Sequence, residues 1–265
     1  MIRNCVKFAA MINIGTSGFS YKDWTGIFYP AGLSSRDWLS FYSREFNTCE
    51  INSTYYVIPS AAALKSMVER TGEDFSFVFK ANQAITHERK NSARICEAFC
   101  QALEPVIASG KLGCILAQFP YSFNFNSYNW EYLAQLKNNL KGLPIVIEFR
   151  NARWLRVEVF QWLRQQDMGF CCVDEPQLPN LLPPVAEATS KVGYIRFHGR
   201  NKEKWWQHEQ AYERYDYTYK PDELKEWLPK IQKLAAATEK TFIFANNHWQ
   251  AQSIDTVRQL RMMLK

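Results

Sequence analysis

Four short segments share one pattern, in which a polar residue, an apolar residue and a second polar residue follow an apolar run. They are Glu50-Ile51-Asn52, Lys80-Ala81-Asn82, Glu148-Phe149-Arg150 and Arg196-Phe197-His198. Residues i and i+2 of a strand point to the same side, so each segment presents two polar side chains together. Carboxylates, lysine and histidine can exchange protons with a substrate, and arginine can bind a carboxylate or phosphate through two hydrogen bonds. The pattern therefore predicts acid–base chemistry on an anion.

Side-chain chemistry divides the candidate residues into two groups. For catalysis we consider Glu50 or Glu148 as the general base and Lys80 or His198 as the general acid. The residues expected to bind the substrate stand at strand ends or in the loops that follow them: Tyr21, Trp24, Asn52, Tyr55, His87, Gln118, Arg150, Asp174, Arg196, Asn246 and Asn247. The two asparagines follow the last apolar run, where barrels of parallel strands often bind phosphate. An anionic substrate is therefore favoured.

The same charged residues could instead form a purely structural ion-pair network. With the histidines neutral, the set holds as many cations as anions: Lys80, Arg150, Arg196, Glu50, Glu148 and Asp174. An unpaired buried charge is costly, so a balanced set suits a self-paired network as well as a dry catalytic site. We favour the functional site, because gathering so many charges is an expensive way merely to stabilise a fold.

A divalent-metal site is a further alternative. Glu148, Asp174 and His198 end three successive apolar runs, an arrangement similar to the metal sites of sugar isomerase and epimerase barrels. Arg150 and Arg196 would repel a cation, however, and four histidines are too few for a histidine-rich trinuclear zinc site. We therefore expect no metal and no other cofactor, with a divalent cation as the alternative.

Strand and helix patterns alternate along the chain and indicate how these residues are positioned. Eight short apolar runs are expected to be strands: residues 12–15, 48–52, 75–80, 112–119, 144–150, 170–174, 193–198 and 241–245. Seven of them precede helical patterns: residues 34–45, 60–71, 92–109, 128–140, 154–166, 221–237 and 253–264. Strands separated by helices pair in parallel. The sequence therefore predicts an α/β fold, a single (β/α)8 TIM-type barrel over residues 11–265, preceded by a disordered extension of residues 1–10. A doubly wound sheet is the alternative, but no Gly-x-Gly-x-x-Gly follows the first strand.

Composition indicates the cellular compartment and limits the kinds of binding partner. Lys and Arg number 32 and Asp and Glu 26, and the resulting charge of +6 is too small for a dedicated nucleic-acid-binding arm. The seven cysteines lie mostly in apolar runs, which is typical of reduced, buried thiols in a cytoplasm. The apolar segments are too short or too interrupted to cross a membrane. We therefore expect a cytoplasmic protein without a membrane partner.

Aromatic residues are abundant, with 9 Trp, 13 Tyr and 18 Phe. Many of them gather in the loops after the first, second and seventh predicted strands: Phe19, Tyr21, Trp24, Phe28, Tyr29, Tyr55, Tyr56, Trp205, Trp206, Tyr212, Tyr215, Tyr217 and Tyr219. Loop aromatics either pack a lid or stack on a sugar or base. The loop of residues 200–220 is long enough to close over a site.

Three segments resemble the hallmark sequences of the YecE-like family, domain of unknown function number 72. They are residues 14–21, 24–30 and 46–56, and the resemblance continues through Gln118-Phe119-Pro120, Glu148-Phe149-Arg150 and Asn246-Asn247. The chain departs from the family at Tyr55, where phenylalanine is frequent, and at Arg153. The resemblance implies a TIM-type barrel in a bacterial or archaeal protein and supplies no established reaction.

Together these features favour an enzyme that acts by acid–base chemistry on a small anionic, sugar- or nucleotide-like molecule at the carboxyl-terminal mouth of the barrel. Whether it is an isomerase, a lyase or a hydrolase stays open, as does the oligomeric state. One alternative is a barrel that processes or binds nucleic acid, as endonuclease IV barrels do. The other is a barrel that binds a ligand without catalysis.

Overall fold

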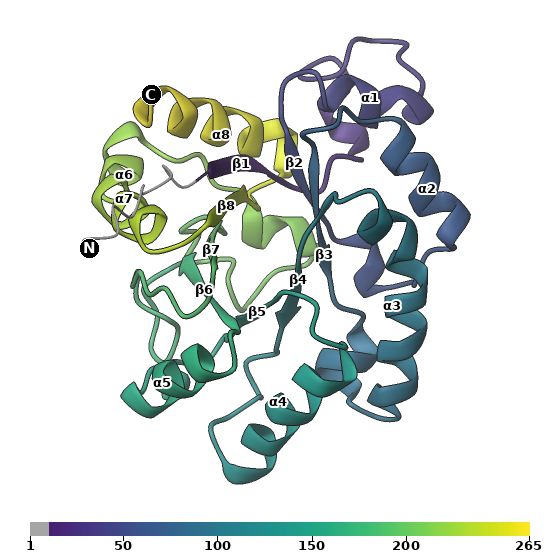
Figure 1. Ribbon diagram of the computed structural model, residues 1–265. Coiled ribbons are helices and arrows are strands. Elements are labelled where there is room, and N and C mark those ends of the chain that lie inside the picture. Colours follow the sequence, from purple (N-terminus) through teal and green to yellow (C-terminus); the bar gives the residue numbers. More distant parts are fainter. Residues whose placement is uncertain (1–10) are drawn as a thin grey trace, which may run out of the picture.

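Eight parallel strands close into a barrel in chain order (Figure 1). The computed structural model describes residues 11–265. The strands are β1 (Met11–Ser17), β2 (Thr48–Ile51), β3 (Ser76–Lys80), β4 (Leu112–Gln118), β5 (Ile145–Glu148), β6 (Gly169–Asp174), β7 (Val192–Phe197) and β8 (Lys240–Ala245). The predicted α/β barrel is thus confirmed, whereas the prediction for residues 1–10 lies outside the described residues.

Helices cover the outside of the barrel (Figure 1). They are α1 (Trp38–Tyr42), α2 (Ala61–Glu69), α3 (Ser92–Ala108), α4 (Ser127–Asn139), α5 (Val157–Gln165), α6 (Pro221–Lys225), α7 (Leu228–Ala236) and α8 (Gln252–Met263). An irregular connection, residues 175–191, follows β6. Across residues 11–265, no helix combines the length and the apolar character that crossing a membrane requires.

The helix predicted over residues 221–237 is in fact two helices, α6 and α7. Pro229 is the reason, because proline lacks an amide hydrogen and its ring would clash with the carbonyl of Lys225 in a continuous helix. The break lies at Glu226 and Trp227, and it allows the Trp227 indole to point inward, where it is fully buried. The sequence pattern alone did not reveal this interruption.

The side chains of the strands alternate between the helix layer and the barrel interior, as predicted. Phe149 stacks on Trp154 with 4.4 Å between ring centroids, and Phe197 packs against Trp227 at 5.3 Å. Both phenylalanines therefore face outward beneath the helices. Their neighbours in the chain, Glu148 and Arg196, consequently face the interior.

Aromatic side chains fill much of the barrel interior beside the charged residues. The rings of Phe242 and Phe244 on β8 are stacked 6.1 Å apart, and Tyr194 lies 5.4 Å from Phe244. Gly113 on β4 leaves space for this layer, since a Cβ at that position would lie only 2.6 Å from Phe242 Cζ. This apolar packing closes the interior beneath the polar residues.

The first and last strands form the closing seam of the barrel. β1 pairs with β8 over six residue pairs, from Met11 with Lys240 to Thr16 with Ala245. Gly15 allows β1 to approach β2 closely, because a Cβ there would lie 2.2 Å from the Thr48 carbonyl oxygen.

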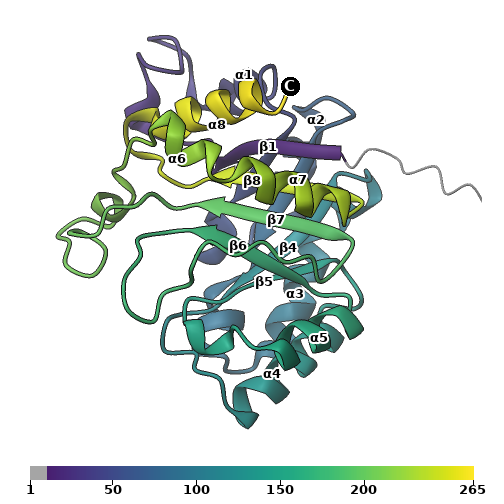
Figure 2. The ribbon, with the colours of Figure 1, turned by 90° about the vertical axis from the view of Figure 1, so that its left-hand side faces the viewer.

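Figure 2 shows the connection between β7 and α6 extending past the carboxyl ends of the strands. That end of the barrel carries the charged residues.

Candidate active site

Arg196 joins two glutamates across the interior of the barrel. Its Nη2 donates to Glu50 Oε1 at 2.6 Å, and its Nη1 donates to Glu148 Oε2 at 2.7 Å. Tyr194 occupies the second oxygen of Glu50, donating to Oε2 at 2.6 Å. All four side chains are buried, so strands β2, β5 and β7 are linked by charge-assisted hydrogen bonds shielded from water.

The network continues from Glu148 to the connection after β6. Glu148 Oε1 lies 2.6 Å from Arg150 Nε, and Arg150 Nη1 reaches Glu175 Oε2 at 3.3 Å. The other Glu175 oxygen accepts a hydrogen bond from the Leu182 amide at 3.0 Å. Alternating charges therefore run without interruption from Glu50 to Glu175.

These contacts set the protonation of Glu148 and Glu175 differently. Burial by itself would raise the pKa of Glu148, but Arg150 and Arg196 outweigh it and hold that pKa well below its usual range. Within residues 11–265, Arg150 is the one cation paired with Glu175, and burial raises the pKa of Glu175 to about 7. Glu148 is consequently a fixed anion, whereas Glu175 changes charge near neutral pH.

His198 is buried between Glu148 and Asn246. The Asn246 amide nitrogen lies 3.0 Å from His198 Nδ1, which must therefore accept, and Nε2 donates to Glu148 Oε1 at 3.2 Å. Burial, reinforced by Arg150, lowers the pKa of His198 well below its usual range. The imidazole is therefore neutral, and its one N–H points at a glutamate.

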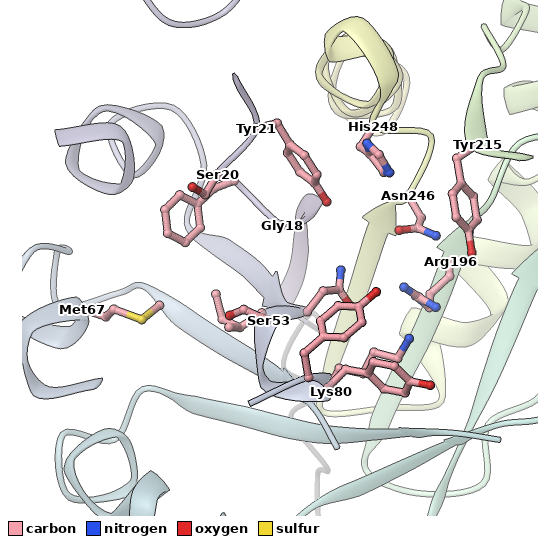
Figure 3. Close-up of a pocket in the computed structure, with 15 residues that line it drawn as sticks. Gly18, Ser20, Tyr21, Ser53, Met67, Lys80, Arg196, Tyr215, Asn246 and His248 are labelled. Carbon is pink, nitrogen blue, oxygen red and sulfur yellow. The ribbon is translucent and has the colours of Figure 1, made fainter. Parts of the chain in front are cut away.

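A cavity of about 440 Å³ lies at the mouth of the barrel above this network (Figure 3). It is lined by Gly18, Phe19, Ser20, Tyr21, Ile51, Asn52, Ser53, Tyr55, Tyr56, Met67, Lys80, Arg196, Tyr215, Asn246 and His248. This lining includes two cationic side chains, Lys80 and Arg196, and no carboxylate. The cavity is large enough for a small organic molecule, and its charge suits an anion.

Lys80 is an ionisable residue of the cavity whose amine has no hydrogen-bond or ion-pair partner in the described part of the chain. Its Nζ lies 4.5 Å from the centroid of the Tyr55 ring, and within residues 11–265 it makes neither an ion pair nor a hydrogen bond. Burial, together with the nearby Arg196, lowers the pKa of Lys80 to about 7, although Glu148 and Glu50 oppose the shift. Neutral amine and ammonium are thus present in comparable amounts near pH 7.

One wall of the cavity is aromatic. Tyr21 and His248 stack with 4.5 Å between centroids and an interplanar angle of 7°. Trp24 holds this pair in place, because its indole Nε1 donates to the His248 carbonyl at 2.8 Å. His248 Nδ1 and Asn52 Oδ1 are buried and have no hydrogen-bond partner in the described structure.

The structure separates the predicted site residues into three groups. Those that line the cavity are Tyr21, Asn52, Tyr55, Lys80, Arg196 and Asn246. Those that form the network beneath it are Glu50, Glu148, Arg150 and His198. Those that lie outside the lining are Trp24, His87, Gln118, Asp174 and Asn247.

Other protein groups engage most of the third set. Gln118 donates to the Phe119 carbonyl at 2.8 Å, and Asn247 donates to the Tyr217 carbonyl at 2.9 Å. His87 packs its ring edge against Tyr55 at 5.0 Å and therefore supports the cavity wall from behind. We do not include these residues among the proposed ligand contacts.

The carboxylate of Asp174 is bonded to groups other than Glu148 and His198. It accepts hydrogen bonds from Arg200, from the Tyr219 hydroxyl at 2.6 Å and from the Trp227 indole at 2.7 Å. Among the residues that the structure describes, no three His, Cys, Asp or Glu side chains are grouped as a metal site. Asp174 instead anchors the loop after β7 and the start of α7.

Sequence reasoning missed several residues of the lining, among them His248 and Met67. His248 follows Asn246 by two positions, so the same polar, intervening, polar pattern at the end of β8 could have identified it. Met67 belongs to α2, and no strand-end pattern points to it. Of the loop aromatics, Phe19, Tyr21, Tyr55, Tyr56 and Tyr215 line the cavity.

The fold and this charged mouth define a (β/α)8 barrel protein with a pocket at the carboxyl ends of its strands. The family model described as protein of unknown function DUF72 matches residues 13–265, and the chain belongs to that family. The resemblance predicted from the segments around residues 14–56 is thereby confirmed.

Individual relatives support this assignment. The UPF0759 protein YunF of Bacillus subtilis is 30% identical over 270 residues, which cover 96% of this chain and 95% of YunF. The UPF0759 protein YecE of Escherichia coli is 30% identical over 117 residues, 43% of this chain and 39% of YecE. Crystal structures of DUF72 family proteins are also similar. The one from Thermotoga maritima has 37% identity and a TM-score of 0.89, covering 96% of this chain and 99% of its own. The one from Enterococcus faecalis has 26% identity and a TM-score of 0.85, covering 96% and 95%.

Proposed function

We propose that the protein is an enzyme that acts by acid–base chemistry on a small anionic, sugar- or nucleotide-like molecule at the mouth of the barrel. The observation that carries this proposal is the lining of the cavity, which includes Lys80 and Arg196 but no carboxylate, since Glu50 and Glu148 are buried behind Arg196. A buried cation attracts an anion most strongly where no carboxylate competes at the surface.

The two cations have different electrostatic surroundings. Arg196 is already neutralised by Glu50 and Glu148, although its Nε has no hydrogen-bond partner. Lys80 has no carboxylate of its own, and when protonated it is the uncompensated charge of the cavity. We therefore assign binding of the ligand's anionic group chiefly to Lys80.

Aromatic side chains favour a ligand with a flat or apolar face. Tyr55 and Tyr56 come from the turn after β2, and Tyr215 comes from the loop after β7. Figure 3 shows Tyr215 next to Arg196 and Tyr21 next to His248. Rings in such positions stack on sugars and on nucleobases, while the cations hold a phosphate or carboxylate.

Lys80 is our candidate for proton transfer. Its lowered pKa allows it to accept a proton as the amine and to donate one as the ammonium at the same pH. Glu148 is a poor base because two arginines stabilise its anionic form, and the N–H of His198 is directed at Glu148. We assign these two residues, with Glu50, to positioning Arg196 rather than to proton transfer.

The test is a ligand screen by thermal unfolding. Sugar phosphates and nucleotides are compared with the corresponding uncharged sugars and nucleosides, in the wild type and in Lys80→Met. A ligand at 100 times its Kd stabilises the folded state by about 2.7 kcal/mol. For a domain of this size that is a rise in Tm of about 5–10 °C. We expect this rise for an anionic ligand with the wild type, and a smaller one with Lys80→Met.

Lys141→Met is the matched control, since it also removes one lysine charge, from the exposed ion pair with Glu97. It should leave the Tm shift intact. The anion-binding proposal fails if no anionic ligand raises the Tm, or if both lysine variants behave alike.

Turnover is measured on the ligands that bind. Each is incubated with the wild type or Lys80→Met, and its loss or rearrangement is followed by NMR. Conversion by the wild type alone supports an enzyme. Saturable binding without conversion supports the non-catalytic barrel. Salt-dependent binding of oligonucleotides, without binding of mononucleotides, supports the nucleic-acid alternative.

A further inference from the structure

The amine of Lys80 differs from that of the buried Lys111 in its surroundings. Lys111 Nζ donates to the carbonyls of Val68 and Thr71 at 2.8 and 2.9 Å, which satisfies the carboxyl end of α2. Lys80 Nζ has no such acceptor in the described chain and lies over the face of Tyr55. Lys111 therefore has a structural role, whereas the amine of Lys80, which has no hydrogen-bond acceptor in the described chain, faces a cavity.

We propose that Lys80 is a nucleophile that forms an imine with an aldehyde or ketone group of the substrate. This inference rests on the proposed function, because it uses the same cavity and adds a carbonyl group to the anionic ligand. Three observations carry it: the amine lines the cavity, no carboxylate pairs with it, and Arg196 lines the same cavity.

These surroundings favour the form of the amine that reacts. Only a neutral amine attacks a carbonyl, and a lysine that is desolvated or placed near another cation loses its proton more easily. Burial and the nearby Arg196 disfavour the ammonium, whereas the face of the Tyr55 ring attracts a cation. Glu50 and Glu148 would favour the ammonium, but both are bonded to Arg196.

The reaction balances without a further reagent. The neutral amine attacks the carbonyl carbon, and a carbon–nitrogen bond forms. The carbonyl oxygen takes two protons and leaves as water. Starting from the ammonium and the carbonyl compound, the products are the protonated imine and one water molecule. The positive charge stays on nitrogen, and neither an oxidant nor a reductant takes part.

A protonated imine withdraws electrons from the carbon beside it. That carbon can then lose a proton or release a carbon–carbon bond, and both are steps of isomerases and lyases. Among the reaction types that the sequence left open, this inference therefore favours an isomerase or a lyase over a hydrolase. The substrate class is a small anionic aldehyde or ketone, such as a sugar phosphate in its open-chain form or a 2-oxo acid.

The test is reductive trapping of the imine. The protein is incubated with glyceraldehyde 3-phosphate, pyruvate or pyridoxal phosphate in the presence of sodium cyanoborohydride, which delivers hydride to the protonated imine and fixes it as a secondary amine. Intact mass and peptide mapping locate the product. We expect one adduct per chain on the peptide that contains Lys80. Neither Lys80→Met nor Lys80→Arg should form it, and Lys141→Met should form it normally.

The pH dependence distinguishes Lys80 from the surface lysines. Trapping at Lys80 should increase as the pH rises through about 7, because the pKa of Lys80 is lowered to that value. An ordinary lysine has a pKa near ~10.4 and reacts slowly in this range. Inorganic phosphate should slow trapping at Lys80 by competing for the cavity. Lys80→Arg keeps the positive charge but lacks the amine, so it replaces Lys80→Met in the trapping experiment if Lys80→Met does not fold.

Adducts spread over several lysines, or equal labelling of Lys80→Met and wild type, would overturn the imine. The proposed function is tested separately by anions without a carbonyl group, such as glycerol phosphate and AMP. If these raise the Tm but no aldehyde is trapped, the imine is wrong and anion binding stands. If an uncharged aldehyde is trapped as fast as a charged one, the imine stands and anion binding is wrong.

Discussion

Glu148 and Arg196 form an ion pair 2.7 Å long, between strands β5 and β7, in a part of the barrel where both side chains are almost fully shielded from water. Each has further partners, so the pair lies at the centre of the chain of charges from Glu50 to Glu175. Buried ion pairs of this kind add little net stability when complete, but they are expensive to break from one side.

Replacing Glu148 with glutamine should therefore destabilise the protein strongly. The substitution keeps the shape but leaves Arg150 and Arg196 with one anionic partner each, and a loss of about 3–5 kcal/mol in the free energy of unfolding is expected. Urea unfolding followed by circular dichroism measures it. Glu239→Gln, which breaks the exposed 3.0 Å pair with Lys191, is the control and should have almost no effect. Equal losses in the two variants would contradict the central role of Glu148.

The raised pKa of Glu175 makes part of the stability depend on pH. Burial raises this pKa from 4.5 to about 7, so between these values the folded state binds a proton that the unfolded state releases. The contribution of Glu175 to the free energy of unfolding is complete below pH 4.5. It is lost as the pH rises through about 7. Its size is on the order of 3–4 kcal/mol, since one pKa unit corresponds to about 1.4 kcal/mol.

The histidines of the unfolded chain also titrate in this range, so the comparison is made with Glu175→Gln, which cannot ionise. The free energy of unfolding of the wild type minus that of the variant should fall from pH 4.5 to 7.5. A difference that stays constant across this range would show that Glu175 titrates normally.

Lys80 should produce the opposite slope at higher pH. In the unfolded chain its pKa returns to about 10.5, whereas in the folded protein it is about 7. Between these values the unfolded state holds more protons, so the contribution of Lys80 to the free energy of unfolding rises with pH. The free energy of unfolding of the wild type minus that of Lys80→Met should therefore increase from pH 7 to 10. A flat difference would show that the ammonium of Lys80 is not destabilised by its surroundings.

The loop of residues 200–220 is anchored by one of two adjacent tryptophans. Trp205 is 1% exposed and lies under the guanidinium groups of Arg150 and Arg214, at 5.8 and 5.4 Å, whereas Trp206 is 50% exposed. Trp205→Ala should remove packing and so reduce the free energy that favours the closed loop by about 3 kcal/mol. That change raises the open population of the loop on the order of 100-fold.

Limited proteolysis with trypsin reports this opening, because the loop contains several lysines and arginines. Cleavage within the loop should accelerate in Trp205→Ala and stay near the wild-type rate in Trp206→Ala. Similar rates in both variants would mean that Trp205 does not hold the loop.

The barrel and the positions of the polar pairs could be predicted because they depend on short-range patterns. The alternation Glu148-Phe149-Arg150 is set by the period of a strand, and parallel strands bring such ends to one rim. The helix break at Pro229 was missed because apolar residues continue at helical spacing on both sides of it. A proline near the second residue of a helix is compatible with a new start as well as with a kink.

The partners within the site could not be predicted, because they are set by closure of the barrel. Arg196 meets Glu50 across 146 positions of sequence, and no local pattern indicates which glutamate it binds. Asp174 looked like a rim residue, yet Trp227 turns inward at the α6–α7 break and binds it. Sequence reasoning identified charged residues at the mouth, and only the tertiary contacts separate those that are neutralised from Lys80.

The seam between β1 and β8 has a consequence for how the chain reaches its native state. β8 lies between β1 and β7 and pairs with each over six residues, yet it is the last of the strands to be synthesised. Until residues 240–245 leave the ribosome, β1 and β7 each carry a row of unsatisfied amide and carbonyl groups, which attract other chains. A chain that stops short of Lys240 should therefore aggregate, and the nascent protein should depend on protection of these two edges until synthesis is complete.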